Sequence, residues 1–227
     1  MKSIKCASNT LGMLVMVGMV TSCMSIPKQK KETNMVEIPL IVSNKNVQTT
    51  YPNLDKTIRL NVTSTVTENE LIDDSNLPTT DKKLFLFSRF RFIPTPSIRD
   101  FADDATNNYM QRMGLDVTQS GTFRFDVEVK TFKIIWLQFP NNIADCEVVI
   151  NYKLLDNTGQ TIVPSSTASS RVRAIPLENF GTTLGRAYAE ALNNVNWDRI
   201  AKYLMVTNTP KQEANTQVTG AGDTALE

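Results

Sequence analysis

The chain has 227 residues and carries 24 basic and 23 acidic side chains, for a formal net charge of +1. This near-balance excludes the broad positive surface with which proteins hold nucleic acid or anionic lipid. The chain contains no histidine, which removes the commonest general base, the usual zinc ligand and every serine–histidine or cysteine–histidine pair. We therefore expect a protein that is not an enzyme, holds no metal or cofactor and binds no nucleic acid.

The first 23 residues have the pattern of an export signal. Lysines stand at positions 2 and 5, and the apolar run Leu-Gly-Met-Leu-Val-Met-Val-Gly-Met-Val follows at 11–20. This run is too short to cross a bilayer as a helix, but it matches the apolar middle of such a signal. It leads into Val20-Thr21-Ser22-Cys23, which resembles the lipobox of bacterial lipoproteins: a branched apolar residue, two small residues and a cysteine.

The lipobox resemblance implies that residues 1–22 are a signal peptide cut before Cys23, which then carries acyl chains such as palmitate. An ordinary secretory signal and an uncleaved anchor helix are the alternatives, although neither needs a cysteine at this place. Met24 follows the cysteine, so the aspartate that resembles an inner-membrane retention signal is absent. By this analogy we expect a membrane-anchored envelope protein that faces the periplasm from the outer membrane.

Removal of the signal would also change the charge and the cysteine content. Lys2 and Lys5 would be lost, which lowers the net charge from +1 to −1. Cys6 would leave with them and Cys23 would be acylated, so Cys146 would be the remaining thiol and no intramolecular disulfide could form.

Composition divides the rest of the chain into three parts. Residues 23–35 are polar and lack periodicity, which predicts a flexible tether. Residues 207–227 are rich in Thr, Gln, Asn, Gly and Ala, which predicts a disordered tail. Between them we expect a single domain at 36–206, long enough to bury a hydrophobic core.

Alternating apolar and polar residues predict the strands of this domain. The pattern is clear in four segments and weaker in two others. Asp156-Asn157-Thr158-Gly159 is a tight-turn signal that should join two of the strands as a hairpin. The clear segments are 57–63, 123–130, 146–154 and 160–172, and the weaker ones are 37–42 and 83–92.

Two segments change to helical spacing. Ser97 can cap a helix with one apolar face, which Gly114 would end. The second helical pattern runs from about 178 to 204, with a break near Asn196. Because each pattern is apolar on one face alone, each helix should lie on a sheet. The fold class is therefore predicted to be α+β, with a mostly antiparallel sheet and two amphipathic helices packed on one face.

The order of these elements resembles that of the YajG-type lipoproteins and, more loosely, the auxiliary lipoproteins of envelope transport systems. The likeness covers 58–204 and includes Gly114-Leu115-Asp116-Val117 after the first helix and Leu154-Leu155-Asp156-Asn157-Thr158-Gly159 at the hairpin. The terminal helix adds Ala189-Glu190-Ala191-Leu192. An early Asp-x-Arg loop expected after the first strand is replaced by 65–70. The resemblance implies an envelope protein that acts by binding.

One segment is a candidate partner or ligand patch. The alternation is lost over 134–140, and the candidate residues are Ile135, Trp136, Leu137 and Phe139. An exposed apolar patch with an aromatic centre is typical of an anchor for a protein or an apolar ligand. Burial on both faces of the sheet, as an extension of the core, explains the same pattern.

Three further features have ordinary structural explanations. The aromatic and basic residues at 85–92 could stack on bases, but their parity favours the core side of a strand. Asp103 and Asp104 could bind a metal, but their place in the first turns of a helix suits the helix dipole. Cys146 shares the parity of apolar neighbours and should be a buried small residue.

These features favour a lipid-anchored, non-enzymatic binding or adaptor module of the cell envelope, whose partners are the membrane and another envelope protein. The alternative is a carrier that holds a lipid or another apolar ligand between the helices and the sheet.

Overall fold

The computed structural model describes residues 34–43, 50–51, 54, 56–67, 70–80, 90–138, 143–174 and 179–205. The predicted signal peptide and tail lie outside these residues, as do Cys23, nearly all of the tether and 83–89 of the weaker strand pattern. The described elements are β1 (Asn34–Pro39), β2 (Ile58–Ser64), β3 (Ile72–Asp73), β4 (Phe90–Thr95), α2 (Ile98–Arg112), β5 (Phe123–Gln138), β6 (Ile143–Leu155), β7 (Thr161–Arg173), α3 (Phe180–Asn193) and α4 (Trp197–Leu204).

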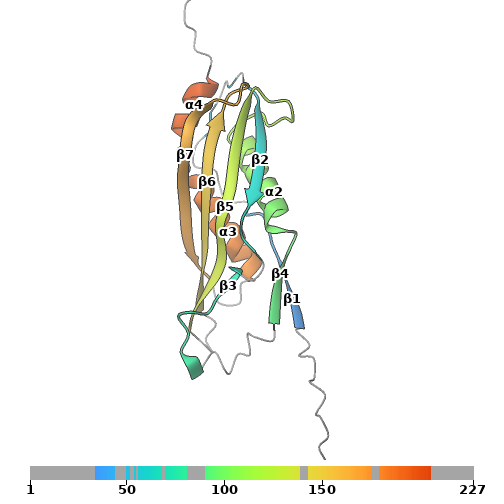
Figure 1. Ribbon diagram of the computed structural model, residues 1–227, viewed down its shortest axis with the longest axis vertical. Helices are drawn as coiled ribbons and strands as arrows, with labels where there is room; N and C mark the ends of the chain where they lie inside the picture. Colours follow the sequence, from blue (N-terminus) through green and yellow to red (C-terminus); the bar gives the residue numbers. More distant parts are fainter. Residues whose placement is uncertain are drawn as a thin grey trace, which may run out of the picture. The chain divides into compact units, whose positions relative to one another are not determined.

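The central sheet is mixed, with the order β2-β5-β6-β7 and with β3 beside β5 (Figure 1). Only β5–β6 and β6–β7 are antiparallel in this sheet, whereas β2 and β3 both pair with β5 in parallel. The prediction of a mostly antiparallel sheet is therefore wrong. Turn signals in the sequence indicate hairpins between neighbouring strands. In contrast, a long crossover that contains β4 and α2 connects β2 to β5, and a connection of this kind joins parallel strands.

A second, two-stranded sheet joins β1 to β4, also in parallel, with Val36 opposite Phe92. The pattern at 37–42 predicted a strand a few residues later than β1 begins. The end of the 83–92 pattern falls on the start of β4.

Strand β5 keeps one apolar face along its whole length because of a bulge. Phe125, Val127 and Val129 are buried, and the register with β6 then shifts by one residue at Lys130. Beyond the bulge, Phe132, Ile134 and Trp136 are buried and continue this face. A bulge inserts one unpaired residue and so changes which residues share a face. The change of parity in the sequence marks this bulge.

The helices begin and end largely where the sequence predicts. Ser97 caps α2, with its side chain accepting a hydrogen bond from the Asp100 backbone N at 3.2 Å. Gly114 follows the helix at φ +86°, which glycine adopts without strain. The second helical pattern is two helices, α3 and α4, and Asn196 caps the latter by accepting from the Arg199 backbone N at 3.1 Å.

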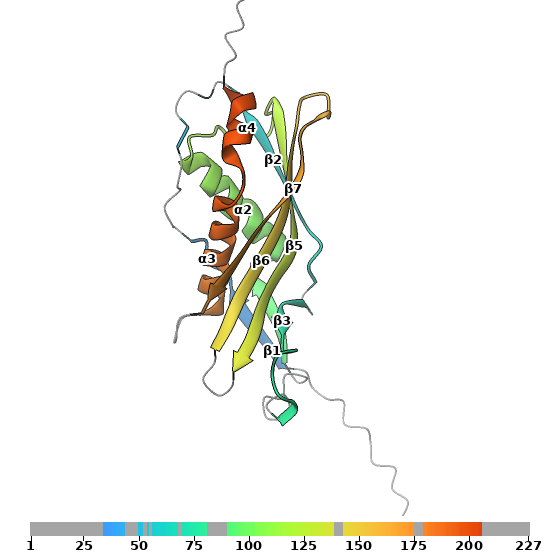
Figure 2. The same ribbon diagram turned by 90° about the vertical axis from the view of Figure 1, so that its left-hand side faces the viewer.

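All three described helices lie on one side of the central sheet (Figure 2). Aromatic side chains fill the space between these layers. Phe101 of α2 lies 5.8 Å from Phe132 and 5.6 Å from Tyr188 of α3, measured between ring centroids. Trp197 of α4 lies 5.3 Å from Phe125. Burial of such large rings is a main source of stability in a core of this kind.

The other face of the central sheet carries ion pairs. Asp126 lies 2.9 Å from Arg124 and 3.5 Å from Lys153. Asp145 pairs with Arg171 at 2.9 Å and also with Arg173. Because this face is polar and the opposite face is apolar, polar and apolar residues alternate along the strands.

Candidate functional site

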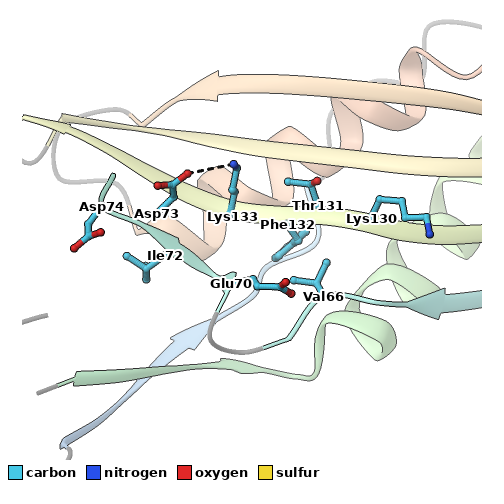
Figure 3. A pocket seen from close by; sticks show the side chains of 9 residues that line it. All are labelled: Val66, Glu70, Ile72, Asp73, Asp74, Lys130, Thr131, Phe132 and Lys133. Carbon is cyan, nitrogen blue, oxygen red and sulfur yellow. Dashed lines mark hydrogen bonds and ion pairs between the residues drawn. The ribbon is translucent and has the colours of Figure 1, made fainter. Parts of the chain in front are cut away.

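The candidate site is a hollow of about 360 Å³ at the edge of the central sheet, which we call the edge hollow. It lies where β2 and β3 leave a gap along β5 (Figure 3). Its lining residues come from β5, β3 and the segments beside them: Val66, Glu70, Ile72, Asp73, Asp74, Lys130, Thr131, Phe132 and Lys133.

The number of residues between the two stretches of pairing differs between the β2–β3 side and β5. Pairing with β2 ends at Val129, whose carbonyl accepts from the Thr65 backbone N at 3.1 Å. Pairing with β3 begins at Ile134, whose N–H donates to the Leu71 carbonyl at 2.8 Å. Seven residues, 65–71, separate the two pairings on that side, whereas four, 130–133, separate them on β5 itself. No strand among the described residues covers this part of the edge.

The lining has an apolar and a charged side. Val66 and Ile72 are half-buried, and Phe132 is fully buried beneath them. Two lysines and three carboxylates supply the rest of the lining, apart from Thr131. The edge hollow therefore offers both an apolar wall and fixed charges of both signs.

Lys133 forms the centre of the charged side. Its ammonium lies 3.2 Å from the Asp73 carboxylate and 3.3 Å from that of Glu147 on β6. Burial opposes the charge on Lys133, but these two carboxylates outweigh it and raise the pKa of the ammonium. Hydrogen bonds from Ser75, followed by Lys133, lower the pKa of Asp73.

The remaining charges are also held by neighbours. Glu70 accepts hydrogen bonds from the Thr67 backbone N at 2.7 Å and from its hydroxyl at 3.0 Å, which lower the pKa of Glu70. Lys130 lies 2.6 Å from Glu128. The shifts at Glu70, Asp73 and Lys133 favour their charged forms. A general acid or base needs a pKa close to the working pH, so this arrangement suits binding better than proton transfer.

The structure places the predicted patch mostly inside the protein. Ile135 and Trp136 are 4% and 5% exposed, and Leu137 is half-buried. Trp136 packs edge-on against Phe180 of α3, with ring centroids 5.2 Å apart. Phe139 lies outside the described residues. Whether this segment also binds a partner stays a prediction.

The other sequence candidates do not join the edge hollow. Asp103 and Asp104 are exposed on α2, where burial and then the charge of Asp104 raise the pKa of Asp103. Cys146 is fully buried on β6. Within the described residues, no cluster of three or more carboxylate or cysteine side chains could hold a metal ion.

Sequence reasoning missed the edge hollow. Its components are separated by about sixty residues in the chain, and only the pairing of β3 with β5 brings them together. The one local signal of the edge hollow in the sequence is the change, at Lys130, in the alternation of apolar and polar residues. Across the described part of the chain, no helix has both the length and the apolar character that a membrane span requires.

Neither a protein-family model nor a curated protein matches the chain. Among solved structures, it is similar to a Xanthomonas campestris protein of the DUF330 family, at 12% identity and a TM-score of 0.48, covering 74% of this chain and 94% of that one. The PelC dodecamer protein of Paraburkholderia phytofirmans gives 10% identity and a TM-score of 0.35, over 64% and 94%. A minor lipoprotein from Acinetobacter baumannii gives 13% and 0.33, over 66% and 96%. With TM-scores below 0.5, these likenesses carry no functional argument.

Proposed function

We propose that the chain is a lipoprotein of the bacterial cell envelope, anchored through Cys23, whose folded part is a non-enzymatic binding module. The observation that carries this proposal is Val20-Thr21-Ser22-Cys23 directly after the apolar run at 11–20. Acyl chains buried in a leaflet contribute about 0.8 kcal/mol per CH₂ group, so two or more chains anchor a protein durably. By the analogy of Met24, the module faces the periplasm from the outer membrane.

Two properties of the chain support binding over catalysis. The pKa shifts of the edge hollow favour charged side chains that do not exchange protons near neutral pH. The chain also lacks histidine, the residue most often used for that exchange. A hollow of this volume with a few fixed polar groups has the size and chemistry of a binding site.

Mass spectrometry of the purified full chain tests the anchor. We expect the mature protein to begin at an acylated Cys23, and Cys23→Ser to abolish both cleavage and labelling with palmitate. Cys146→Ser is the matched control, because its thiol is buried and should carry no acyl chain. An intact, unacylated Met1 terminus in the wild type would contradict the proposal.

Crosslinking in intact cells tests the binding role. We expect the lipidated protein to crosslink to at least one other envelope protein, and failure to do so would contradict an adaptor. Native mass spectrometry separates the adaptor from the lipid carrier, since co-purifying lipid would favour the carrier.

A further inference from the structure

We infer that the polar face of the central sheet binds one sugar ring of a neutral glycan, in a second hollow that we call the face hollow. It has a volume of about 200 Å³ and lies on the side of the sheet that the described helices leave uncovered (Figure 2). It shares no lining residue with the edge hollow, so this inference goes beyond the proposed function. Its lining residues come from four neighbouring strands: Asn61, Thr63, Asp126, Val127, Glu128, Asn151, Tyr152, Lys153 and Ser165.

The pairing of the strands places the polar side chains of the face hollow in two rows. Neighbouring strands lie about 4.8 Å apart, and alternate residues of one strand lie about 6.8 Å apart on the same face. The two rows therefore frame an area about the size of a six-membered sugar ring with its hydroxyl groups. On β2, β5 and β6, the first row is Asn61, Asp126 and Lys153, and the second is Thr63, Glu128 and Asn151.

A bulge in β7 brings a further hydroxyl to the rim. Tyr152 pairs with Ser166 and Leu154 pairs with Val163, so two steps along β6 match three along β7. Ser165 lies within the longer stretch, where it is exposed and lines the hollow. Bulges are common next to active sites because the extra residue redirects a side chain.

The charges of the face hollow are compensated within the chain. Asp126 lies 2.9 Å from Arg124 and 3.5 Å from Lys153, and Glu128 lies 2.6 Å from Lys130. Each charged side chain of the lining therefore has a partner of opposite charge. An ionic ligand would have to compete with these pairs, so the site favours a neutral one.

Several hydrogen-bonding groups of the lining remain for a ligand. All four strands around the hollow are described over this stretch, and no hydrogen bond between described residues uses the hydroxyl of Thr63 or Ser165. Asn151 accepts from the Thr167 hydroxyl at 2.8 Å through its side-chain oxygen, which leaves the two N–H groups of its amide. The side chain of Lys153 is 42% exposed. Together these groups offer both donors and acceptors.

A sugar ring has the chemistry that these properties require. Its neighbouring hydroxyl groups each donate and accept, and it carries no charge. Val127 and Tyr152 turn their side chains into the core, where they are 1% and 5% exposed, so an apolar ligand would meet polar groups and leave them unpaired. An extended peptide would gain no backbone pairing, because the hollow lies on a face of the sheet and not at an edge. The volume is below the 300–1,000 Å³ typical of sites for larger ligands, and so fits a single ring.

The test uses the full acylated chain, labelled with ¹⁵N and held in nanodiscs. The probes are three neutral trisaccharides: maltotriose, cellotriose and chitotriose. We expect at least one of them to shift the amide resonances of 61–63, 126–128, 151–153 and 165 more than those of the rest of the chain. The permethylated form of that probe keeps the rings but has no hydroxyl donors, and should bind at least about tenfold more weakly.

Two variants and a matched control localise the binding. Thr63→Val removes a hydroxyl but keeps the β-branched shape that suits a strand, and should weaken the probe about fivefold. Ser165→Trp fills the hollow and should weaken the probe at least about tenfold. Thr161→Val, exposed on β7 outside the lining, should leave the affinity unchanged. Because Thr63 is exposed, its variant keeps the test valid if Ser165→Trp does not fold.

The outcomes separate this inference from the proposed function. Equal affinity of the probe for wild type, Thr63→Val and Ser165→Trp would overturn the assignment to the face hollow. Absence of binding by all three trisaccharides, in a protein that still crosslinks to envelope proteins, would overturn the sugar chemistry and leave the binding module intact. Sugar binding by a protein that crosslinks to no envelope protein would support this inference and contradict the adaptor.

Discussion

Two glycines of α3, four residues apart, allow β1 and the residues after it to lie directly against the helix. A Cβ atom added at Gly181 would stand 1.7 Å from the Pro39 carbonyl oxygen, and one at Gly185 would stand 1.9 Å from that of Ile41. Residues four apart share one face of a helix. The sequence Gly-Thr-Thr-Leu-Gly is therefore a packing surface for the end of β1 and the residues after it, and β1 is the described strand nearest in sequence to Cys23.

Alanine at these positions should loosen the contact between β1 and α3. Overpacking costs about 1–3 kcal/mol, and the better helix propensity of alanine offsets about 1 kcal/mol of it. Because both clashes are with backbone, we expect a net loss near 2 kcal/mol for Gly181→Ala, or a fall in Tm of about 4–8 °C. Thr182→Ala, half-buried on the same helix, is the control and should change Tm by less than half as much. An unchanged Tm in Gly181→Ala would show that β1 is not seated on this helix.

Asp73 and Asp103 should affect stability in opposite directions as the pH falls. Hydrogen bonds from Ser75 and the Lys133 charge lower the pKa of Asp73, so its stabilising effect is present above its unfolded pKa and is lost as the pH falls through the folded value. Burial and the Asp104 charge raise the pKa of Asp103, so the folded state disfavours its ionised form, and stability is gained as the pH falls through that raised pKa.

Urea unfolding at pH 7, 5, 4 and 3 measures both effects. Asp73→Asn should be less stable than wild type at pH 7, with a difference that shrinks toward pH 3. Asp103→Asn should be as stable as wild type or more so at pH 7, with a difference that also shrinks in acid. Differences that stay constant with pH would mean that neither carboxylate acts through its charge.

At the scale of elements, β7 shows how the chain protects the outer edge of its sheet. The carbonyl of Ser169 accepts from the Asn194 side chain at 2.8 Å, and that of Arg173 accepts from Arg186 at 3.1 Å. Both donors come from α3 or its cap, and Pro164 lies within the strand. Capped carbonyls and proline discourage pairing with another strand.

A substitution in β5 can separate the two explanations of the 134–140 segment. Trp136 is buried against Phe180, and removal of a buried tryptophan side chain costs about 3–5 kcal/mol. We expect Trp136→Ser to lower Tm strongly and Leu137→Ser, which is half-buried, to lower it far less. Unchanged stability in Trp136→Ser together with loss of a crosslinked partner would instead identify the segment as a docking site.

The sequence predicts those features of the fold that depend on local pattern. Ser97, Gly114 and the hairpin at 156–159 lie where the pattern places them, because capping and turn preferences act within a few residues. The parallel pairing of β2 with β5 and the edge hollow could not be predicted in this way. Both depend on contacts between segments some sixty residues apart, and no local preference encodes such a pairing.

At the scale of the whole molecule, the two sheets differ in how much structure surrounds them. In the central sheet, β5 and β6 each have a strand on both sides and helices over one face. In the β1–β4 pair each strand has one neighbouring strand, and the pair packs against α3 at the two glycines. Regions with fewer buried contacts open locally at lower free energy, so β1 should be the first part of the described fold to open.

Native-state hydrogen exchange of the full chain tests this order. We expect the amides of β5 and β6 to exchange slowest, at the rate of global unfolding, and those of β1 and β4 to exchange by a faster, local opening. Gly181→Ala should speed exchange in β1 and β4 by more than in the central strands, because it weakens only the support of the smaller sheet. If all strands of the wild type exchange at one rate, the two sheets unfold as a single cooperative unit. In that case a pull on the proposed lipid anchor would act on the whole fold at once, because β1 could not detach before the central sheet.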